Sequence, residues 1–276
     1  MTHGTFTVAL ISEVFFGPAR DDLQRRLAEA KGLGADLAVL PELPLNPWSP
    51  ASRETSEEDA EPPDGPRCRA QAAAARGAGI GLVGGAIVRD PDTTQRHNTA
   101  MIFDAEGALV GTYCKLHLPE EPGFWESSHY RPGTEPPATI DAFALPLGVQ
   151  ICSDINRPQC SHLLAAEGAA VIAVPRATEQ RTYPRWRVVM RATAITGGVY
   201  VLSVNRPRPE QGVELGGPSL AVGPDGAVLL ETTDPIAIVQ LDAAQVERAR
   251  EGYPASLPLR AGLYAAAWSV IAHRDQ

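Results

Sequence analysis

Short, mainly apolar runs recur along this sequence of 276 residues and alternate with segments of helical periodicity. The runs typical of strands are residues 6–11, 36–41, 80–88, 148–152, 170–175 and 199–205. Several are apolar at every position, as in strands that are buried on both faces of a sheet. The segments typical of helices are residues 18–32, 66–77, 159–167 and 184–195. Such alternation predicts an α/β fold.

Two further segments, residues 99–110 and 219–230, place an acidic residue and a glycine between apolar strands, which is typical of β-hairpins. Either an internal pseudo-symmetry of two layers or common hairpin chemistry accounts for their likeness. Residues 46–67 are rich in Pro, Ser, Glu and Asp and predict a long surface loop of the kind that covers a site. No linker divides the chain, so we expect one domain over residues 1–276, with a mixed sheet or two packed sheets.

Composition excludes several classes of protein. With 24 Lys and Arg against 33 Asp and Glu, the formal charge is 24 − 33 = −9, which argues against a nucleic-acid binder. The four cysteines lack C-x-x-C spacing, so neither a disulfide framework nor a zinc site is indicated. The sequence has no basic leader with a cleavage site and no run of about 20 apolar residues. We therefore expect a soluble protein in a reducing, cytoplasmic setting, without a membrane partner.

Three polar residues follow strongly apolar runs, where side chains emerge at the edge of a sheet. They are Glu42, Lys115 and Cys152. Taken singly, each has an ordinary structural interpretation: a solvated strand end, a surface charge and a small core residue. Together they form a coherent chemical set, because a thiol nucleophile needs a base to deprotonate it and a cation to stabilise the oxyanion.

The order and surroundings of these residues strengthen this hypothesis. Pro41-Glu42 comes first, Lys115-Leu-His-Leu-Pro-Glu-Glu-Pro-Gly-Phe-Trp-Glu126 follows, and Ile151-Cys152-Ser153-Asp154 comes last. This pattern strongly resembles the nitrilase superfamily of carbon–nitrogen hydrolases over nearly the whole chain. The resemblance implies a four-layer α-β-β-α sandwich in which Glu42 is the base, Lys115 stabilises the oxyanion and Cys152 is the nucleophile. The stretch after Lys115 is most similar to the N-carbamoylputrescine amidase branch, with Glu126 as a second glutamate beside the site.

The sequence departs from the family pattern at three places. Ser153 stands where an aromatic residue usually follows the nucleophile, and Pro158-Gln159 replaces Pro-Glu. Arg176 occupies a position that is usually small and polar in that branch. A guanidinium there suits either a substrate carboxylate, held through a bidentate fork, or a structural ion pair with Asp154. The putrescine specificity is therefore not carried over.

Other chemistry-bearing residues are expected to play lesser parts. His117, Glu120 and Glu121 lie on a proline-flanked loop without metal-ligand geometry, so we expect no metal, and we expect His117 to orient the Lys115 loop. Cys152 is expected to differ from the other three cysteines because backbone N–H groups and Lys115 would lower its thiol pKa. The cysteines expected to be inert are Cys68, Cys114 and Cys160.

The resemblance implies hydrolysis of a non-peptide C–N bond in a small amide or N-carbamoyl compound, through an acyl or carbamoyl group on Cys152. The oxyanion would be stabilised by Lys115 and the backbone N–H of Ser153, and no cofactor is implied. The residues expected to line the substrate pocket are Trp48, Phe124, Trp125, Arg176 and Tyr183. A nitrilase or an acyltransferase on the same three residues, and a catalytically silent scaffold, remain alternatives.

The resemblance also implies a homodimer or a larger homo-oligomer, paired through helices near the strand that bears Cys152 and through the C-terminal segment. Residues 263–271 form an apolar stretch that would cross the interface between copies. The alternative is a tail that packs on its own domain.

Overall fold

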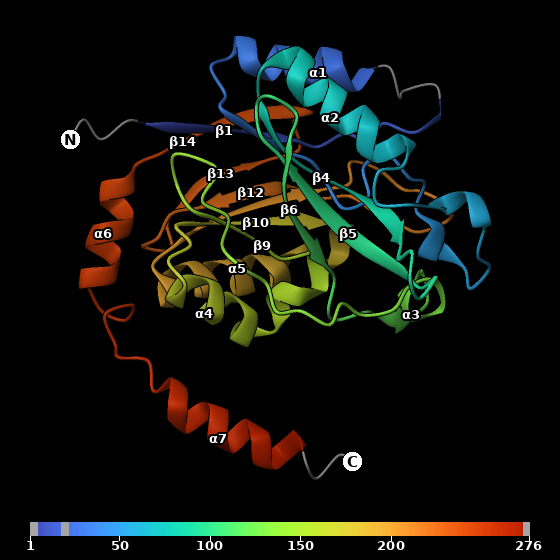
Figure 1. The fold of residues 1–276 in the computed structure, drawn as a ribbon. Helices are drawn as coiled ribbons and strands as arrows, with labels where there is room; N and C mark the ends of the chain where they lie inside the picture. Colours follow the sequence, from blue (N-terminus) through green and yellow to red (C-terminus); the bar gives the residue numbers. More distant parts are fainter. Residues whose placement is uncertain (1–4, 18–21, 273–276) are drawn as a thin grey trace.

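The computed structural model describes residues 5–17 and 22–272. Two β-sheets pack face to face, and a pair of helices covers the outer side of each sheet (Figure 1). This arrangement is the four-layer α-β-β-α sandwich that the resemblance to the nitrilase superfamily implies. Of the two architectures left open, the structure has the two packed sheets.

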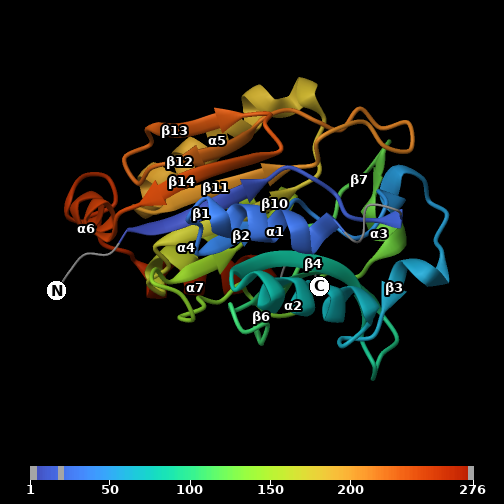
Figure 2. The same ribbon diagram turned by 90° about the horizontal axis from the view of Figure 1, so that it is seen from above.

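The first sheet has seven strands, in the order β14-β1-β2-β4-β5-β6, with β3 pairing to β4. Its strands are β1 (Phe6–Ile11), β2 (Leu37–Val39), β3 (Ala60–Glu61), β4 (Gly81–Arg89), β5 (Arg96–Phe103), β6 (Leu109–Cys114) and β14 (Ile236–Leu241). Helices α1 (Asp22–Gly32) and α2 (Pro66–Ala78) cover its outer face, and Figure 2 shows them side by side across β1, β2 and β4. Both strand ends that precede Glu42 and Lys115, those of β2 and β6, belong to this sheet.

The second sheet has five strands, in the order β13-β12-β11-β10-β9. They are β9 (Leu147–Val149), β10 (Val171–Arg176), β11 (Tyr200–Asn205), β12 (Ser219–Val222) and β13 (Val228–Thr232). Helices α4 (Pro158–Ala166) and α5 (Tyr183–Gly197) cover its outer face. Because β9, β10 and β11 are parallel, their carboxyl ends meet at one edge, and Cys152 follows β9 at that edge.

Alternating side chains of one strand enter two different cores. On β10, Val171 and Ala173 pack between the two sheets, whereas Ile172 and Val174 pack against the helices. Burying one such aliphatic side chain contributes about 1.5–3 kcal/mol, so a strand covered on both faces gains from apolar residues at every position. This double burial explains the wholly apolar runs of the sequence.

The segment of residues 46–67 is less exposed than expected. It contains the 3₁₀ turns η2 (Ser49–Ala51) and η3 (Glu57–Asp59) as well as β3, and both Asn46 and Trp48 are fully buried. The Trp48 indole N–H donates to the carbonyl of Gly123 over 2.9 Å. The prediction of a plain surface loop is therefore wrong for the first part of this segment, because Trp48 anchors it inside the molecule.

Several short elements follow β6 in the chain. They are β7 (Glu120–Glu121), β8 (Phe124–Trp125), the one-turn helix α3 (Glu126–His129) and the 3₁₀ turn η4 (Cys152–Asn156). A further 3₁₀ turn, η5 (Gln180–Thr182), precedes α5. Strands β7 and β8 form a small antiparallel pair of their own. These elements place Glu126 and Cys152 at the same end of the sandwich.

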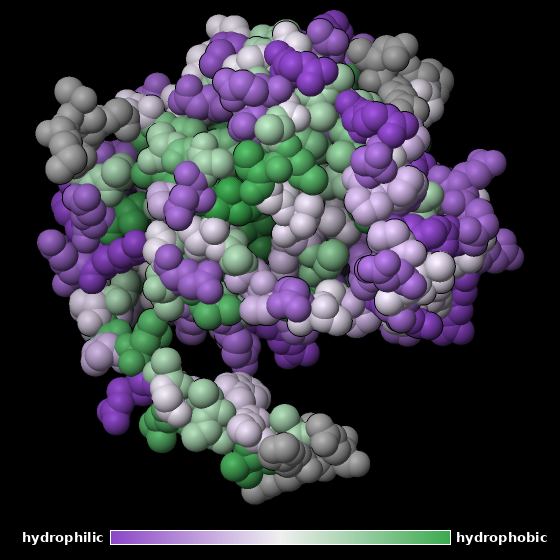
Figure 3. All heavy atoms as spheres, in the orientation of Figure 1, coloured by the Kyte–Doolittle hydropathy of each residue, from purple (hydrophilic) through white to green (hydrophobic). Residues whose placement is uncertain are grey.

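The chain continues beyond the sandwich through α6 (Ala243–Glu251) and α7 (Ala261–Ala272). Helix α7 stands apart from the body in Figures 1 and 3, with Leu263, Tyr264 and Trp268 each more than half exposed. The alternative of a C-terminal tail that packs on its own domain is therefore not what the structure shows. Among the described helices, none is both long and apolar enough to cross a membrane.

Candidate active site

Four of the residues singled out from the sequence come together in the closed interior of the sandwich. Glu42 follows β2, Lys115 follows β6, Glu126 opens α3 and Cys152 opens η4. All four are buried, and the most exposed of them, Cys152, is only 4% exposed. The interpretation of Glu42 as a solvated strand end and of Lys115 as a surface charge is thereby excluded.

Lys115 is the centre of this group. Its Nζ donates to Glu42 Oε1 over 2.7 Å and to both carboxylate oxygens of Glu126 over 2.7 and 2.6 Å. Asn98 Nδ2 donates to the same Oε1 of Glu42 over 2.7 Å. The second oxygen of Glu42, Oε2, is buried without a hydrogen-bond partner among the described residues. Glu42 therefore has one oxygen held in place and one left to accept a proton.

The charges of this group favour a permanent cation at Lys115. Burial disfavours the ammonium, but Glu126 and Glu42 together raise the pKa of Lys115 well above its ordinary value. Burial raises the pKa of Glu126 to about 8, and the negative charge of Glu42 adds to this effect while Lys115 opposes it. Lys115 thus stays charged at neutral pH, and the Glu126 carboxyl takes up a proton far more readily than an exposed glutamate.

Cys152 has an unusual backbone and a protonated thiol. Its φ is +49°, in the left-handed region that a residue with a Cβ rarely adopts, and its Sγ lies 3.7 Å from the Ala177 carbonyl, to which the thiol donates. Burial, followed by the charge of Glu42, raises the thiol pKa well above its ordinary value, although Lys115 lowers it. The expected net lowering of this pKa is therefore wrong, because burial outweighs the lysine. The thiol needs a base, and the unpaired Oε2 of Glu42 is chemically suited to be one.

An apolar cluster lies beside the site, since it includes Ala177, whose carbonyl accepts from the Cys152 thiol. Its buried residues are Leu43, Trp48, Ile87, Tyr130, Ala177, Val213 and Leu215, and the partly buried Ala51, Ala60, Leu118 and Phe124 pack against them. Trp48 and Phe124 meet edge to face, with ring centroids 5.7 Å apart. Trp125 lies apart from this cluster, since the guanidinium of Arg53 covers its ring at 3.9 Å. Trp48, Phe124 and Trp125 are the pocket aromatics predicted on the loops, and the structure brings Trp48 and Phe124 into contact but not Trp125.

Arg176 ends β10 and is fully buried. Its guanidinium donates to Ser203 Oγ over 2.8 Å, to Thr178 Oγ1 over 2.6 Å and to the Pro218 carbonyl, and its carbon lies 5.5 Å from the centre of the Tyr183 ring. All three acceptors are neutral, and no ion pair joins Arg176 to a carboxylate of the described residues. Burial lowers the pKa of Arg176 to about 10.

The structural alternative for Arg176, an ion pair with Asp154, is not formed. Asp154 instead accepts from the ring of His117 over 2.8 Å and from the Tyr113 hydroxyl over 2.8 Å. The expectation that His117 orients the loop of Lys115 agrees with this geometry. Arg176 is left as a buried cation without an acidic partner in the described part of the chain.

Sequence reasoning missed three further polar residues around the group: Asn98, Tyr130 and Arg206. Asn98 holds Glu42, and Arg206 donates to the backbone carbonyls of Glu42 and Leu43. The Tyr130 hydroxyl is buried without a hydrogen-bond partner among the described residues. Arg206 was open to detection, because it follows an apolar strand just as Glu42 does.

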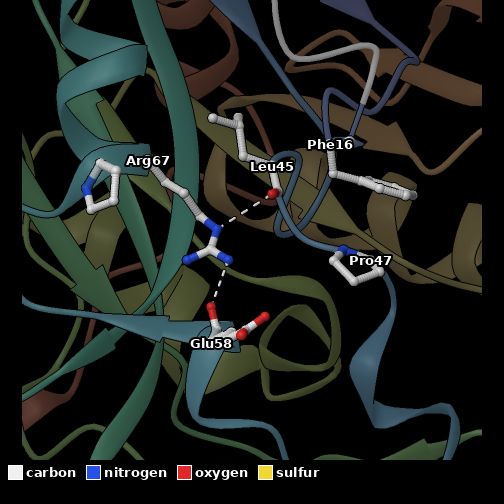
Figure 4. A pocket seen from close by; sticks show the side chains of 7 residues that line it. Phe16, Leu45, Pro47, Glu58 and Arg67 are labelled. Carbon is white, nitrogen blue, oxygen red and sulfur yellow. Dashed lines mark hydrogen bonds between the residues drawn. The ribbon is translucent and has the colours of Figure 1, made fainter.

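Among the described residues, neither a metal centre nor the surface pocket beside Phe16 coincides with the group. No cluster of three or more His, Cys, Asp and Glu side chains in residues 5–17 and 22–272 is arranged to hold a metal ion. A cavity of about 420 Å³ lies beside Phe16, Leu45 and Pro47 (Figure 4). Arg67 at its wall donates to the carbonyls of Leu45 and Glu58, over 3.4 and 2.9 Å. The four buried residues of the site do not line it.

A buried thiol, a lysine held between two carboxylates and a four-layer sandwich define the class of thiol-dependent carbon–nitrogen hydrolases. The comparison with known families agrees: residues 16–251 match the family model described as carbon-nitrogen hydrolase. The chain belongs to this family, within the nitrilase superfamily.

Several named proteins are similar to the chain. It is 30% identical to the chloroplastic omega-amidase of Arabidopsis thaliana over 254 residues, which is 87% of this chain and 68% of that protein. It is 28% identical to the human omega-amidase NIT2 over 95% of this chain and 97% of that protein. A nitrilase of Pyrococcus abyssi is 30% identical over 82% of this chain and 84% of that protein.

Solved structures give the same result. Saccharomyces cerevisiae Nit3, a member of branch 10 of the nitrilase superfamily, has a TM-score of 0.80 and 28% identity, and the match covers 93% of this chain and 97% of that one. An amidase from Nesterenkonia sp. has a TM-score of 0.75 and 25% identity, with 96% and 97% of the two chains covered. These relatives include omega-amidases and an amidase, and they do not single out the N-carbamoylputrescine amidase branch to which the Lys115 stretch is similar.

Proposed function

We propose that this protein is an amidase that hydrolyses a small amide through a thioester on Cys152. The observation that carries the proposal is the placement of Lys115 between Glu42 and Glu126, with one oxygen of Glu42 unpaired inside the buried group. A base, a cation and a thiol are the three components that thiol-dependent acyl transfer requires. The omega-amidases and the amidase among its relatives support the same activity.

In the first half-reaction, Glu42 Oε2 accepts the proton of the Cys152 thiol as Sγ attacks the amide carbon. A carbon–sulfur bond forms, and the electron pair of the carbonyl moves to its oxygen, where Lys115 Nζ and the backbone N–H of Ser153 stabilise the negative charge. The tetrahedral intermediate collapses, the C–N bond breaks, and Glu42 returns the proton to the departing nitrogen. Ammonia leaves and the thioester remains.

In the second half-reaction, water attacks the thioester carbon while Glu42 accepts its proton. The carbon–sulfur bond breaks, and the thiolate of Cys152 recovers a proton from Glu42 as the carboxylic acid departs. Glu126 holds Lys115 through two hydrogen bonds, so it keeps the positive charge of the ammonium close to Cys152. The cycle needs no cofactor.

We propose further that the preferred substrate carries a carboxylate at the end remote from the amide. Two observations support this class: relatives named omega-amidase, and the buried Arg176 without an acidic partner among the described residues. A guanidinium has five N–H donors, and three of them are used in the contacts of Arg176. The remaining donors suit a carboxylate.

Arg176→Gln is expected to raise KM for a four-carbon amide with a terminal carboxylate by roughly 10- to 100-fold, the effect of losing a hydrogen bond to a charged group. The KM for the matching amide with a terminal methyl group should change less than threefold or so. Ammonia release from both substrates measures the effect. An equal loss on both substrates would show that Arg176 is structural.

The same assay separates the alternative activities. An N-carbamoyl compound and a nitrile, each with the same terminal carboxylate, are compared with the amide. Preference for the N-carbamoyl compound would favour the carbamoylase function that the Lys115 stretch resembles, and preference for the nitrile would favour a nitrilase. Transfer of the acyl group to hydroxylamine in place of water would favour an acyltransferase, and no turnover of any compound would favour the silent scaffold.

We also propose that a second copy of the chain covers α7. All twelve residues of this helix are uncharged, and its large side chains, including Leu263, Tyr264 and Trp268, are exposed (Figure 3). A helix that is apolar all round is normally buried, and an exposed apolar patch of this kind marks an interaction surface. The proposal agrees with the homo-oligomer expected from the sequence.

Replacing Leu263 and Trp268 by aspartate is expected to halve the mass observed in sedimentation at micromolar concentration, because two charges on α7 would oppose its burial. Leu33→Asp, which places a charge at an exposed apolar position directly after α1, on the outer side of the other sheet, is the matched control. A wild-type chain that sediments as a monomer would contradict the proposed dimer.

A further inference from the structure

The groups proposed for catalysis are divided between the two sheets. Glu42 and Lys115 follow strands of the seven-stranded sheet, whereas Cys152 follows a strand of the five-stranded sheet. The contact between the sheets is an apolar core, and apolar contact is not directional. Directional contacts near the site must therefore fix how far the thiol lies from the lysine and from the base.

Asp154 supplies one such contact. It lies two residues after Cys152, is fully buried, and accepts hydrogen bonds from two successive backbone N–H groups of the other sheet's loop: Leu116 over 3.2 Å and His117 over 2.9 Å. These are the two residues that follow Lys115. The Tyr113 hydroxyl, from β6 itself, donates to the same carboxylate over 2.8 Å. Asp154 thus ties the turn of the nucleophile to the loop of the lysine.

Arg206 supplies a second contact, in the opposite direction. It follows β11 of the five-stranded sheet and is fully buried. Its guanidinium donates to three backbone carbonyls after β2: Glu42 over 2.9 Å, Leu43 over 3.0 Å and Asn46 over 2.9 Å. Glu210 holds the guanidinium through both carboxylate oxygens, over 2.9 and 2.6 Å. Arg206 thus ties the loop of the base to the second sheet.

Both tied segments contain strained backbone. Leu43 and Cys152 each have a φ of +49°, a conformation that costs an ordinary residue roughly 1–2 kcal/mol. Such strain persists where surrounding contacts over-determine the conformation. Arg206 binds the Leu43 carbonyl directly, and Asp154 belongs to the turn that Cys152 opens. The contacts of Arg206 and Asp154 therefore lie at the two segments whose backbone is strained.

We propose that Asp154 and Arg206 are positioning residues that hold the thiol of Cys152 at its working distance from Lys115 and Glu42. The proposal deepens the proposed amidase function and rests on it. Neither residue touches the reacting atoms in the proposed mechanism, and each acts by binding main chain next to a residue that does. Their removal is therefore expected to affect the rate of reaction more than the binding of substrate.

Asp154→Asn is expected to lower kcat for the amide by roughly 100-fold while KM changes less than about threefold. The substitution leaves one acceptor oxygen in place of two, so this side chain can no longer accept from the N–H groups of Leu116 and His117 and from the Tyr113 hydroxyl together. A displacement of about 1 Å at a reacting centre costs a factor of roughly 10². Arg206→Lys, which keeps the charge but loses the fork that spans three carbonyls, should lower kcat similarly.

The rate at which a small electrophile alkylates Cys152 adds a reading that needs no substrate. Lys115 lowers the pKa of the Cys152 thiol. A larger distance between Lys115 and the thiol in Asp154→Asn should therefore slow alkylation at pH 8 by about tenfold. Glu42 raises the thiol pKa, so a larger distance between Glu42 and the thiol in Arg206→Lys should instead speed alkylation. General loss of structure would change the alkylation rate of both variants in the same direction.

Two matched variants control for stability alone. Glu61→Gln alters another buried carboxylate that accepts two backbone N–H groups, those of Arg67 and Cys68 at the start of α2. Arg250→Lys alters another arginine that binds a backbone carbonyl, that of Ala169. Both controls should keep kcat within about threefold at equal loss of thermal stability. If Asp154→Asn or Arg206→Lys misfolds, Tyr113→Phe and Glu210→Gln loosen the same two ties more gently.

The proposal fails if the controls lose as much kcat as the two test variants, or if both test variants alkylate faster or both slower than the unchanged protein. It also fails if KM rises in proportion to the fall in kcat. Failure of the amidase function is recognised separately, since the unchanged protein would then release no ammonia while the opposite changes in alkylation rate persisted.

Discussion

Replacing Cys152 with alanine is expected to abolish amide hydrolysis while the chain stays folded. The substitution removes the Sγ atom that forms the thioester, so no covalent intermediate can arise. Removal of a nucleophile typically lowers kcat by a factor of 10⁴ or more, to about the level left by binding and oxyanion stabilisation alone. Ammonia release under saturating substrate measures the effect, and circular dichroism with thermal denaturation tests the fold.

Cys160→Ala is the matched control for this variant. Cys160 is also buried, lies on α4 just after the turn of the nucleophile, and has a thiol pKa raised by burial to about 11. Its replacement should leave kcat within about threefold, because this thiol lies outside the group of Glu42, Lys115 and Glu126, and the Asp154 carboxylate near it already accepts other hydrogen bonds. A Cys152→Ala variant with full activity, or a Cys160→Ala variant without any, would overturn the assignment of the nucleophile.

Glu42→Gln is expected to give the second-largest loss, with kcat lower by roughly 10²- to 10⁴-fold, the usual contribution of a general base. Glutamine has the same shape, and its amide oxygen can still accept from Lys115 and Asn98. The atom that replaces Oε2 is an amide nitrogen, which cannot take the proton of the thiol. Steady-state ammonia release and the rate of thioester formation in a single turnover measure the loss.

The same substitution should make the thiol easier to ionise. Glu42 raises the pKa of Cys152, so the neutral glutamine should speed alkylation of the thiol while it slows turnover. Glu61→Gln, which neutralises a buried carboxylate away from the site, should change neither rate more than about threefold. A parallel fall in alkylation and turnover after Glu42→Gln would show general damage and would remove the argument for a base.

Most of the fold could be predicted because its physical cause is written in the local sequence. Residues 6–11 are buried on both faces in β1, and every side chain of this strand except that of Thr7 is apolar. Leu23, Leu27 and Ala30 face the sheet from α1, as their helical spacing predicts. The segment of residues 46–67 was harder, because the anchoring of Trp48 depends on Gly123, which is distant in the sequence.

The candidate site was only partly predictable. Glu42, Lys115 and Cys152 each end an apolar run, so local pattern and motif order point to them. The direction of the thiol pKa was not predictable, because it depends on how deeply Cys152 is buried and on the distance to Glu42. The positions of Asp154 and Arg206 after apolar strands are visible in the sequence, but their contacts were not predictable. Their hydrogen bonds join segments that are about 40 and 160 residues apart.

The division of the site between two sheets also bears on how the protein acquires its activity. Glu42 and Cys152 are separated by more than a hundred residues, and contacts of such long range form late because loop closure must precede them. Strands β1 to β6 and β9 to β13 occupy separate stretches of the chain, whereas β14 joins the first sheet from beyond the second. A chain whose two sheets have not yet docked would have no base near its thiol. The rate at which enzymatic turnover returns during refolding therefore reports how fast one half of the sandwich docks on the other.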